Sequence, residues 1–174
     1  PNNRSIGSYK SAKVSSISFT LPDSIRITAS ITTGSIGDVE NPILLLGGQS
    51  TDQMDSGCGS WYLWSRNSSV NFGIMCYVLQ PTMVITSGSV LKPNKNYVIV
   101  ATYNKTHATL DINDYVFGPF EKSFGVTKTG DHYKIGGKYY WSSYTAFNFG
   151  EIHYIKIENY TVFLENKDRS KDWC

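Results

Sequence analysis

The 174-residue sequence has little charge, few cysteines and no long hydrophobic run, and each shortage excludes a class of protein. Charged residues make up only 17% and hydrophobic residues 40%, which excludes a disordered chain and a coiled coil. The longest wholly apolar stretch, 43–46, is far below the roughly 18 residues that a membrane-spanning segment needs. A scattered net charge of +2 is too weak to attract nucleic acid. We therefore expect neither membrane insertion nor a nucleic-acid partner.

The length of the chain fits one domain, since domains commonly hold about 100 to 200 residues. A chain of this size buries roughly 70% of its unfolded surface, so its cysteines are not needed to hold it together. We expect a single domain over 1–174 with its core at about 14–163. The chain starts at Pro1 without methionine or an apolar leader, so we expect a processed piece of a larger multidomain or spike protein.

Helical periodicity is also missing, because no window of eleven or more residues has apolar side chains at helical spacing. What is present is alternation of apolar and polar residues, with 12 Tyr, 8 Phe and 15 Gly. The predicted strands are 14–20, 24–32, 43–47, 61–66, 70–78, 83–87, 96–103, 106–112, 117–120, 133–136 and 151–158. Short strands without helical crossovers predict an all-β fold, a two-sheet antiparallel β-sandwich or jelly roll, with a barrel as the alternative.

Alternation also assigns side chains to faces of the sheets. In strand 24–32 we expect one packed face and one wet face. The packed set is Ile25, Ile27, Ala29 and Ile31, and the wet set is Ser24, Arg26, Thr28 and Ser30. In strand 151–158 the alternation slips by one residue, which predicts a β-bulge, with either Tyr154 or Ile155 pointing inward.

Cysteines and glycosylation motifs indicate a location. Cys58 and Cys76 flank two expected strands that face each other across a turn at 67–70, a spacing that suits a disulfide, while Cys174 is left unpaired. The cysteine pair and the N-x-[ST] glycosylation sequons both favour an extracellular, cell-surface or virion location. N-x-[ST] triplets also arise by chance in polar loops. The four sequons begin at Asn3, Asn67, Asn104 and Asn159.

Several segments resemble a known family. Tyr133-Lys-Ile-Gly-Gly137, an aromatic loop and the stretch 149–160 look like the last glycine-bracketed strand pair of laminin-G-like, concanavalin A-like jelly rolls. The pair 96–103 and 108–113 is similar to that family's central hairpin, and 24–30 and 43–47 to its early strands. The resemblance covers 15–163 and implies a lectin-like fold, although the family's acidic calcium ligands are missing. Galectin-like heads of viral attachment spikes, such as the rotavirus spike head, are similar in length and in their Tyr-rich loops.

The chemistry of an enzyme is absent from the sequence. Concanavalin-type hydrolases need two carboxylates on one strand face, and the stretch 151–155 offers Glu151 but has His153 and Ile155 at the other positions. No histidines stand at zinc-binding spacing and no phosphate-binding loop is present. We therefore expect no enzyme and no cofactor. Asp52 and Asp55 leave a calcium-binding loop as the alternative.

Segment 138–144 holds the most informative residues, four aromatic side chains interleaved with Lys and Ser. We expect a loop over this segment, because strand alternation does not continue through it, and flat apolar faces beside donors can hold a sugar ring or a partner surface. The predicted ligand-binding residues are Tyr139, Tyr140, Trp141 and Tyr144. The alternative is that these rings cap the core.

A second candidate site consists of Trp61, Tyr62, Trp64 and Arg66. We expect Trp61 and Trp64 to cap the core and Arg66 to contact the ligand. Together these patterns predict a non-catalytic glycan-binding or adhesion module whose partner is a glycan or a cell-surface receptor. The alternative is a protein-interaction or structural spacer domain without sugar binding.

Overall fold

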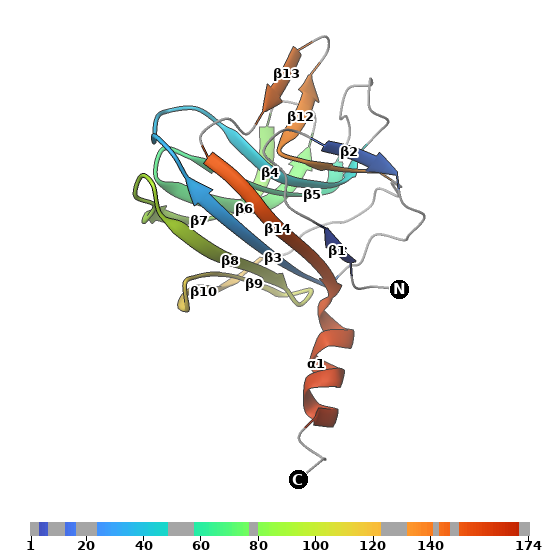
Figure 1. The fold of residues 1–174 in the computed structure, drawn as a ribbon. Helices are drawn as coiled ribbons and strands as arrows, with labels where there is room; N and C mark the ends of the chain where they lie inside the picture. Colours follow the sequence, from blue (N-terminus) through green and yellow to red (C-terminus); the bar gives the residue numbers. More distant parts are fainter. Residues whose placement is uncertain are drawn as a thin grey trace.

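The computed structural model describes residues 4–6, 13–16, 24–48, 58–76, 80–122, 132–140, 143–146 and 150–170, with side chains over 24–46, 61–74, 84–122, 134–137, 150–161 and 163–167. This part of the chain forms two six-stranded antiparallel sheets, a separate two-stranded hairpin and one helix (Figure 1). The predicted all-β, two-sheet sandwich is confirmed.

Each sheet combines strands that are consecutive in the sequence with strands from distant parts of it. In spatial order, sheet A contains β1 (Arg4–Ile6), β14 (Gly150–Asn159), β3 (Ile25–Thr33), β8 (Asn96–Tyr103), β9 (His107–Ile112) and β10 (Tyr115–Glu121). Sheet B contains β2 (Lys13–Ser16), β11 (His132–Ile135), β4 (Asn41–Gly48), β5 (Cys58–Arg66), β6 (Ser69–Cys76) and β7 (Gln80–Ser89). The hairpin pairs β12 (Gly137–Tyr140) with β13 (Ser143–Ala146), and helix α1 (Tyr160–Ser170) follows β14.

The core lies between the two sheets and follows the predicted alternation. The apolar set of β3, namely Ile25, Ile27, Ala29 and Ile31, is fully buried. Trp61 of sheet B stacks on Phe72 at 5.6 Å between ring centroids and reaches Tyr103 of sheet A at 5.4 Å. These three aromatic rings therefore join the two layers, and burial of each contributes stability of the order of 1.5–3 kcal/mol.

The predicted bulge in the last strand is confirmed. The register of β14 against β3 shifts between Ile152 and Tyr154, so Ile152 and Ile155 both point into the core. Tyr154 lies opposite Ser30 on the other face. A bulge keeps the apolar set of a strand on one face where the alternation slips.

Two expectations about secondary structure are wrong. Residues 138–140 and 143–144 are not a loop: Tyr139 pairs with Tyr144 across the hairpin β12–β13, because tyrosines favour extended backbone. Helix α1, which no periodicity predicted, extends away from the sandwich (Figure 1). Its first turn is held by Ser24, which directly precedes β3 and whose carbonyl and hydroxyl accept the N–H groups of Tyr160 and Thr161 at 3.1 and 3.0 Å.

Candidate functional site

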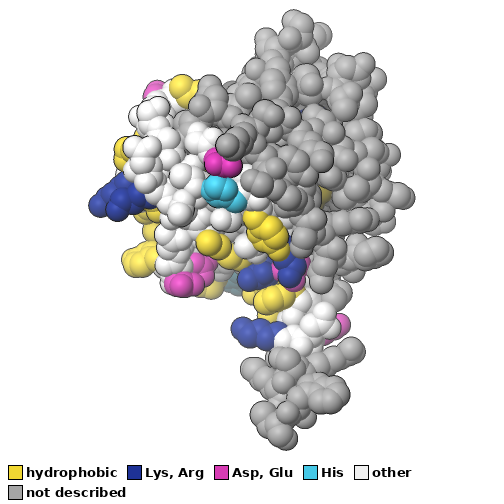
Figure 2. Space-filling view, in the orientation of Figure 1, with side chains coloured by type: hydrophobic (Ala, Val, Ile, Leu, Met, Phe, Trp, Pro, Cys, Tyr) yellow, Lys and Arg dark blue, Asp and Glu magenta, His cyan; other side chains and the backbone are white. Residues whose placement is uncertain are grey.

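The outer face of sheet A, which points away from sheet B, is built from the residues that alternate with the core. Register places Arg26 of β3 beside Thr102 of β8, and Thr102 beside Thr109 of β9. One row along, Val100 lies beside Asp111. In Figure 2 this side of the molecule shows histidine, acidic and basic side chains among separated hydrophobic and polar ones. The described part of this face is therefore chemically mixed.

A groove of about 240 Å³ crosses this face where helix α1 meets the sheet. Strands β3, β8, β9 and β10 form its floor and α1 forms one wall. It is lined by Arg26, Val100, Thr102, Thr109, Asp111, Val116, Tyr160, Phe163, Leu164 and Lys167. Because the floor belongs to paired strands of sheet A, its side chains are held by the hydrogen-bonded sheet.

The guanidinium of Arg26 is fixed on one side of the groove. Its Nη1 donates to Glu158 Oε1 at 2.7 Å and to Thr28 Oγ1 at 3.2 Å, and its Cζ lies 4.2 Å from the ring centroid of Phe163. Glu158 is buried and also lies 3.7 Å from Lys156 Nζ, so its charge is compensated by two cations. Within the part of the chain that the structure describes, both hydrogen bonds of Arg26 use Nη1, and a guanidinium has five N–H groups, so its other nitrogens can donate to a ligand.

Hydrogen-bond acceptors lie on the other side of the groove. The hydroxyls of Thr102 and Thr109 hydrogen-bond to each other. Asp111 is partly buried, and among the described residues none hydrogen-bonds or pairs with its carboxylate. A carboxylate accepts several hydrogen bonds, and one without a partner in a partly buried place is poised to receive donors. The groove therefore combines an acceptor, donors and apolar surface within one small site.

The predicted aromatic residues lie on the hairpin β12–β13 rather than at the groove. Tyr139 is the cross-strand partner of Tyr144, and Tyr140 is that of Ser143. Their side chains, and Trp141 as a whole, lie outside the described residues. Gly136, just before β12, donates its N–H to the Ile43 carbonyl at 3.0 Å, so the hairpin begins near the start of β4.

Arg66 lies at the turn between β5 and β6, at the end of sheet B where β4 begins, since Asn41 pairs with Ser65. Its Nε donates to Asp38 Oδ1 at 2.7 Å, and both side chains are exposed. Hydrogen bonding to Arg66, and next its charge, hold the pKa of Asp38 below its usual value. Arg66 and the hairpin thus belong to the same end of the sandwich. Contact of these residues with a ligand stays a prediction.

The second candidate site is part of the core. Trp61 is fully buried between the sheets, as expected. Tyr62 and Trp64 point to the outer face of sheet B but are 0% and 6% exposed, with ring centroids 4.6 Å apart. The Tyr62 hydroxyl donates to Glu40 at 2.5 Å. Trp64 is buried as expected, but in a separate cluster with Leu45 and Tyr62 rather than against the central core, and Tyr62 is corrected from a candidate contact to a buried residue.

Other predicted sites are placed in part. Cys58 and Cys76 are direct partners in the β5–β6 ladder, so the register agrees with the predicted disulfide, whose formation stays a prediction. Asn67 and Asn104 lie in exposed turns and Asn159 is half-buried at the end of β14, while Asn3 lies outside the described residues. Asp52 and Asp55 lie outside them too. The described part contains no group of three or more potential metal ligands, and no helix in it has the length and apolar content needed to cross a membrane.

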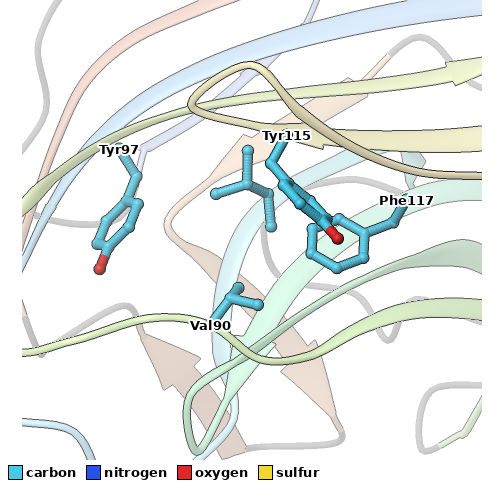
Figure 3. A pocket seen from close by; sticks show the side chains of 5 residues that line it. Val90, Tyr97, Tyr115 and Phe117 are labelled. Atoms are coloured by element: carbon cyan, nitrogen blue, oxygen red, sulfur yellow. The ribbon is translucent and has the colours of Figure 1, made fainter.

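A second cavity, of about 310 Å³, opens at the edge of the sandwich where β10 ends sheet A. We call it the aromatic slot, and Figure 3 shows Tyr97 on one side of it and Tyr115 and Phe117 on the other. Val90 and Ile112 complete the lining. The Tyr97 hydroxyl accepts the Lys92 N–H at 2.7 Å, and the Tyr115 and Phe117 rings lie 4.9 Å apart. With an apolar, uncharged lining, the slot fits an apolar group better than a polyhydroxylated one.

The groove residues were missed because the sequence singled out clusters of aromatic residues. A signal was nevertheless present, since alternation put Arg26 and Thr28 on the wet face of a long strand. An arginine and an aspartate such as Asp111 within central strands are uncommon enough to mark a face kept in contact with water.

Comparisons with known proteins identify the fold. No protein-family model and no curated protein matches the chain. The CBM40 module of Ruminococcus gnavus IT-sialidase, bound to α2,3 sialyllactose, has a TM-score of 0.65 at 11% identity, covering 90% of this chain and 91% of that one. Galectin LEC-6 of Caenorhabditis elegans has a TM-score of 0.53 at 11% identity, covering 88% and 95%.

A mutant of Trypanosoma rangeli sialidase with trans-sialidase activity gives a TM-score of 0.53 at 17% identity over 78% of this chain. The chain spans only 20% of that enzyme's length, whereas it spans nearly all of the module and the galectin. At such identities the likeness concerns architecture. The chain therefore has the fold of a lectin-like jelly roll, a two-sheet antiparallel β-sandwich.

Proposed function

We propose that the protein is a glycan-binding module whose ligand occupies the groove on the outer face of sheet A. The observation that carries the proposal is that one groove is lined by the Arg26 guanidinium, by the partly buried Asp111 carboxylate, which has no partner among the described residues, and by apolar side chains such as Val100 and Val116. A sugar presents hydroxyls that both donate and accept, together with apolar C–H surface, so it needs donors, acceptors and apolar side chains close together. The groove supplies all three.

The structural neighbours support this function at the level of ligand class. The CBM40 module is described as bound to α2,3 and α2,6 sialyllactose, and another neighbour is a galectin. Arg26 and Lys167 give the groove two cations that suit a sialylated glycan, while Asp111 suits the hydroxyls of any sugar. Sialylated and neutral glycans are therefore the two classes to compare.

The setting that we propose is adhesion without catalysis, outside a cell or on a virion. The predicted disulfide and sequons support an oxidising, extracellular location. Concanavalin-type hydrolysis requires a pair of carboxylates on one strand face, and β14 offers only Glu151 at the exposed positions of the relevant motif. The sequence resemblance suggests two kinds of protein that would contain this domain, a laminin-G-like surface protein and a viral attachment spike with a galectin-like head.

A glycan array with wild-type protein and the Asp111→Asn variant tests the proposal. We expect binding to at least one glycan class, weakened about tenfold or more in Asp111→Asn, because a charged acceptor is replaced by a neutral amide. Asp114→Asn is the matched control, since Asp114 lies in the exposed β9–β10 turn outside the groove. Silence of correctly folded protein across the array, or equal binding by wild type and Asp111→Asn, would contradict the proposal.

The second candidate function is protein binding that does not depend on sugar. The aromatic slot favours it, since Tyr115 is 67% exposed beside an apolar cavity that offers few hydrogen-bonding groups. In that case Tyr115→Ala would abolish binding to a protein receptor and leave the glycan array unchanged. Loss of array binding in Tyr115→Ala would instead extend the glycan site to the slot.

A further inference from the structure

A cluster of four polar residues lies on the outer face of sheet A beyond the groove. The Thr32 hydroxyl donates to Asn96 Oδ1, so its oxygen is left to accept the Nε2–H of His153 at 2.5 Å. The other ring nitrogen, Nδ1, lies 3.8 Å from Glu151 Oε1, too far for a hydrogen bond. We call Thr32, Asn96, Glu151 and His153 the His153 cluster.

The chemistry of this cluster matches sugar hydroxyls. An imidazole whose Nε2–H donates can accept at Nδ1, and the nearby Glu151 carboxylate is a second acceptor. The His153 and Glu151 side chains are 37% and 32% exposed, so both acceptors can be reached from solvent. Two acceptors this close fit two neighbouring hydroxyls on one sugar ring.

The cluster and the groove lie along the same strand. Arg26 at the groove and Thr32 in the cluster are six residues apart on β3, which corresponds to about 20 Å. Between them a row across the sheet contains Tyr154, Ser30 and Val98, with Val98 47% exposed. The face thus offers polar contacts at both ends and aromatic, hydroxyl and aliphatic surface between them.

The occupant that fits this face is a chain of sugars rather than a peptide. Strand β3 lies between β14 and β8, so its backbone groups are paired in the sheet and an extended peptide has no edge to join. A partner helix would need a continuous apolar groove, whereas on this face single apolar side chains alternate with polar ones. Successive sugar rings, each with hydroxyl edges and an apolar face, match that alternation.

On the basis of the proposed function, we infer that the outer face of sheet A binds a linear oligosaccharide along β3, with one end in the groove and the other at the His153 cluster. Affinity then depends on chain length. A disaccharide contacts the groove alone, whereas a tetrasaccharide also reaches the cluster. His153 and Asn96 are specificity residues for the longer chain.

The test measures binding by calorimetry for four probes: lactose and lacto-N-neotetraose, each with and without a terminal α2,3-linked sialic acid. In the neutral pair, the sialylated pair or both, the longer probe should bind about tenfold more tightly than the shorter one. This is the gain expected from one or two added hydrogen bonds to a charged or aromatic acceptor. In His153→Ala this gain should vanish while binding of the shorter chain stays unchanged. Asn96→Ala, at an exposed position, should reduce the same gain.

The outcomes separate the inference from the proposed function. Equal affinity for short and long chains, or a His153→Ala variant that keeps the gain, overturns the inference and leaves the groove as the glycan site. A His153→Ala variant that weakens short and long chains equally also overturns it. Binding of none of the four probes by folded protein overturns the inference, whereas the proposed function falls only if the whole glycan array is silent as well.

Discussion

The outer faces of the two sheets are built from the same alternation and have opposite characters. On sheet B, Leu45, Tyr62 and Trp64 point away from the central core, yet they form a second buried cluster. On sheet A, the equivalent positions hold residues such as Arg26 and Asp111, which keep contact with water beside a groove. A stack of large apolar rings stabilises by burial, whereas mixed polar side chains on a rigid sheet are suited to recognition.

This difference teaches where to expect function in a sandwich rich in aromatic residues. Aromatic side chains on the sheet B face contribute to stability, although in the sequence they resemble a sugar-binding platform. The less conspicuous threonines, valines and single charges on the sheet A face form the proposed site. Variants on the two faces should therefore separate loss of stability from loss of binding.

The largest effect is expected on sheet B. Trp64→Ala removes a 6% exposed ring that stacks on Tyr62, and should lower the free energy of unfolding by about 3–5 kcal/mol, the usual cost of truncating a buried Trp. The matched variant on sheet A is Val98→Ala, at a side chain that is 47% exposed. This variant should change the free energy of unfolding by less than about 0.5 kcal/mol. Chemical denaturation measures both. Similar losses for the two variants would remove the distinction between the faces.

The predicted Cys58–Cys76 disulfide should also act on sheet B alone. Its partners face each other across β5 and β6, and the loop that it would close, of about 18 residues, implies a stabilisation of roughly 3 kcal/mol. Reduction of protein produced in a secretory host should lower the melting temperature without changing the affinity for glycans. Peptide mapping under non-reducing conditions gives the direct check, and two free thiols in such protein would rule out the bridge.

The smallest effect is expected at Arg66, the exposed last residue of β5. Because the folded state lowers the pKa of Asp38, this pair stabilises at pH values above the unfolded pKa of the aspartate, and the contribution is lost as pH falls through the folded value. Both side chains are exposed, so Arg66→Ala should leave the melting temperature at neutral pH almost unchanged. A glycan affinity lowered in this variant would instead support the predicted ligand contact of Arg66.

The sequence predicted the core because burial of one strand face leaves a local signature. Ile25, Ile27 and the slip near Ile155 could be read directly, and so could most strands. The groove could not, because Arg26 and Asp111 reach the same groove only through the pairing of β3 with the β8–β9 hairpin, which is distant from it in sequence. Helix α1 was missed for a similar reason: its first turn is held by Ser24, which is 137 residues from Thr161 along the chain.

Tyrosines and tryptophans in the sequence were the least decisive guide to the position of a binding site. Tyr62, Trp64 and Tyr139 are all aromatic residues within strands of alternating pattern, and only the three-dimensional structure shows that the first two are buried. Whether the outer face of a sheet is covered depends on distant segments, which leave no trace in the local pattern. Aromatic clusters in strands therefore predict a sheet more dependably than a binding site.

The most direct test of the account is an amide NMR titration of isotope-labelled protein with sialylated lacto-N-neotetraose. The account predicts that the largest shift changes fall on the outer face of sheet A, at Thr102, Thr109 and Asp111, and extend along β3 toward Thr32. Changes confined to Tyr139, Tyr140 and Tyr144 on the hairpin β12–β13 would contradict it and place the ligand at the aromatic residues instead.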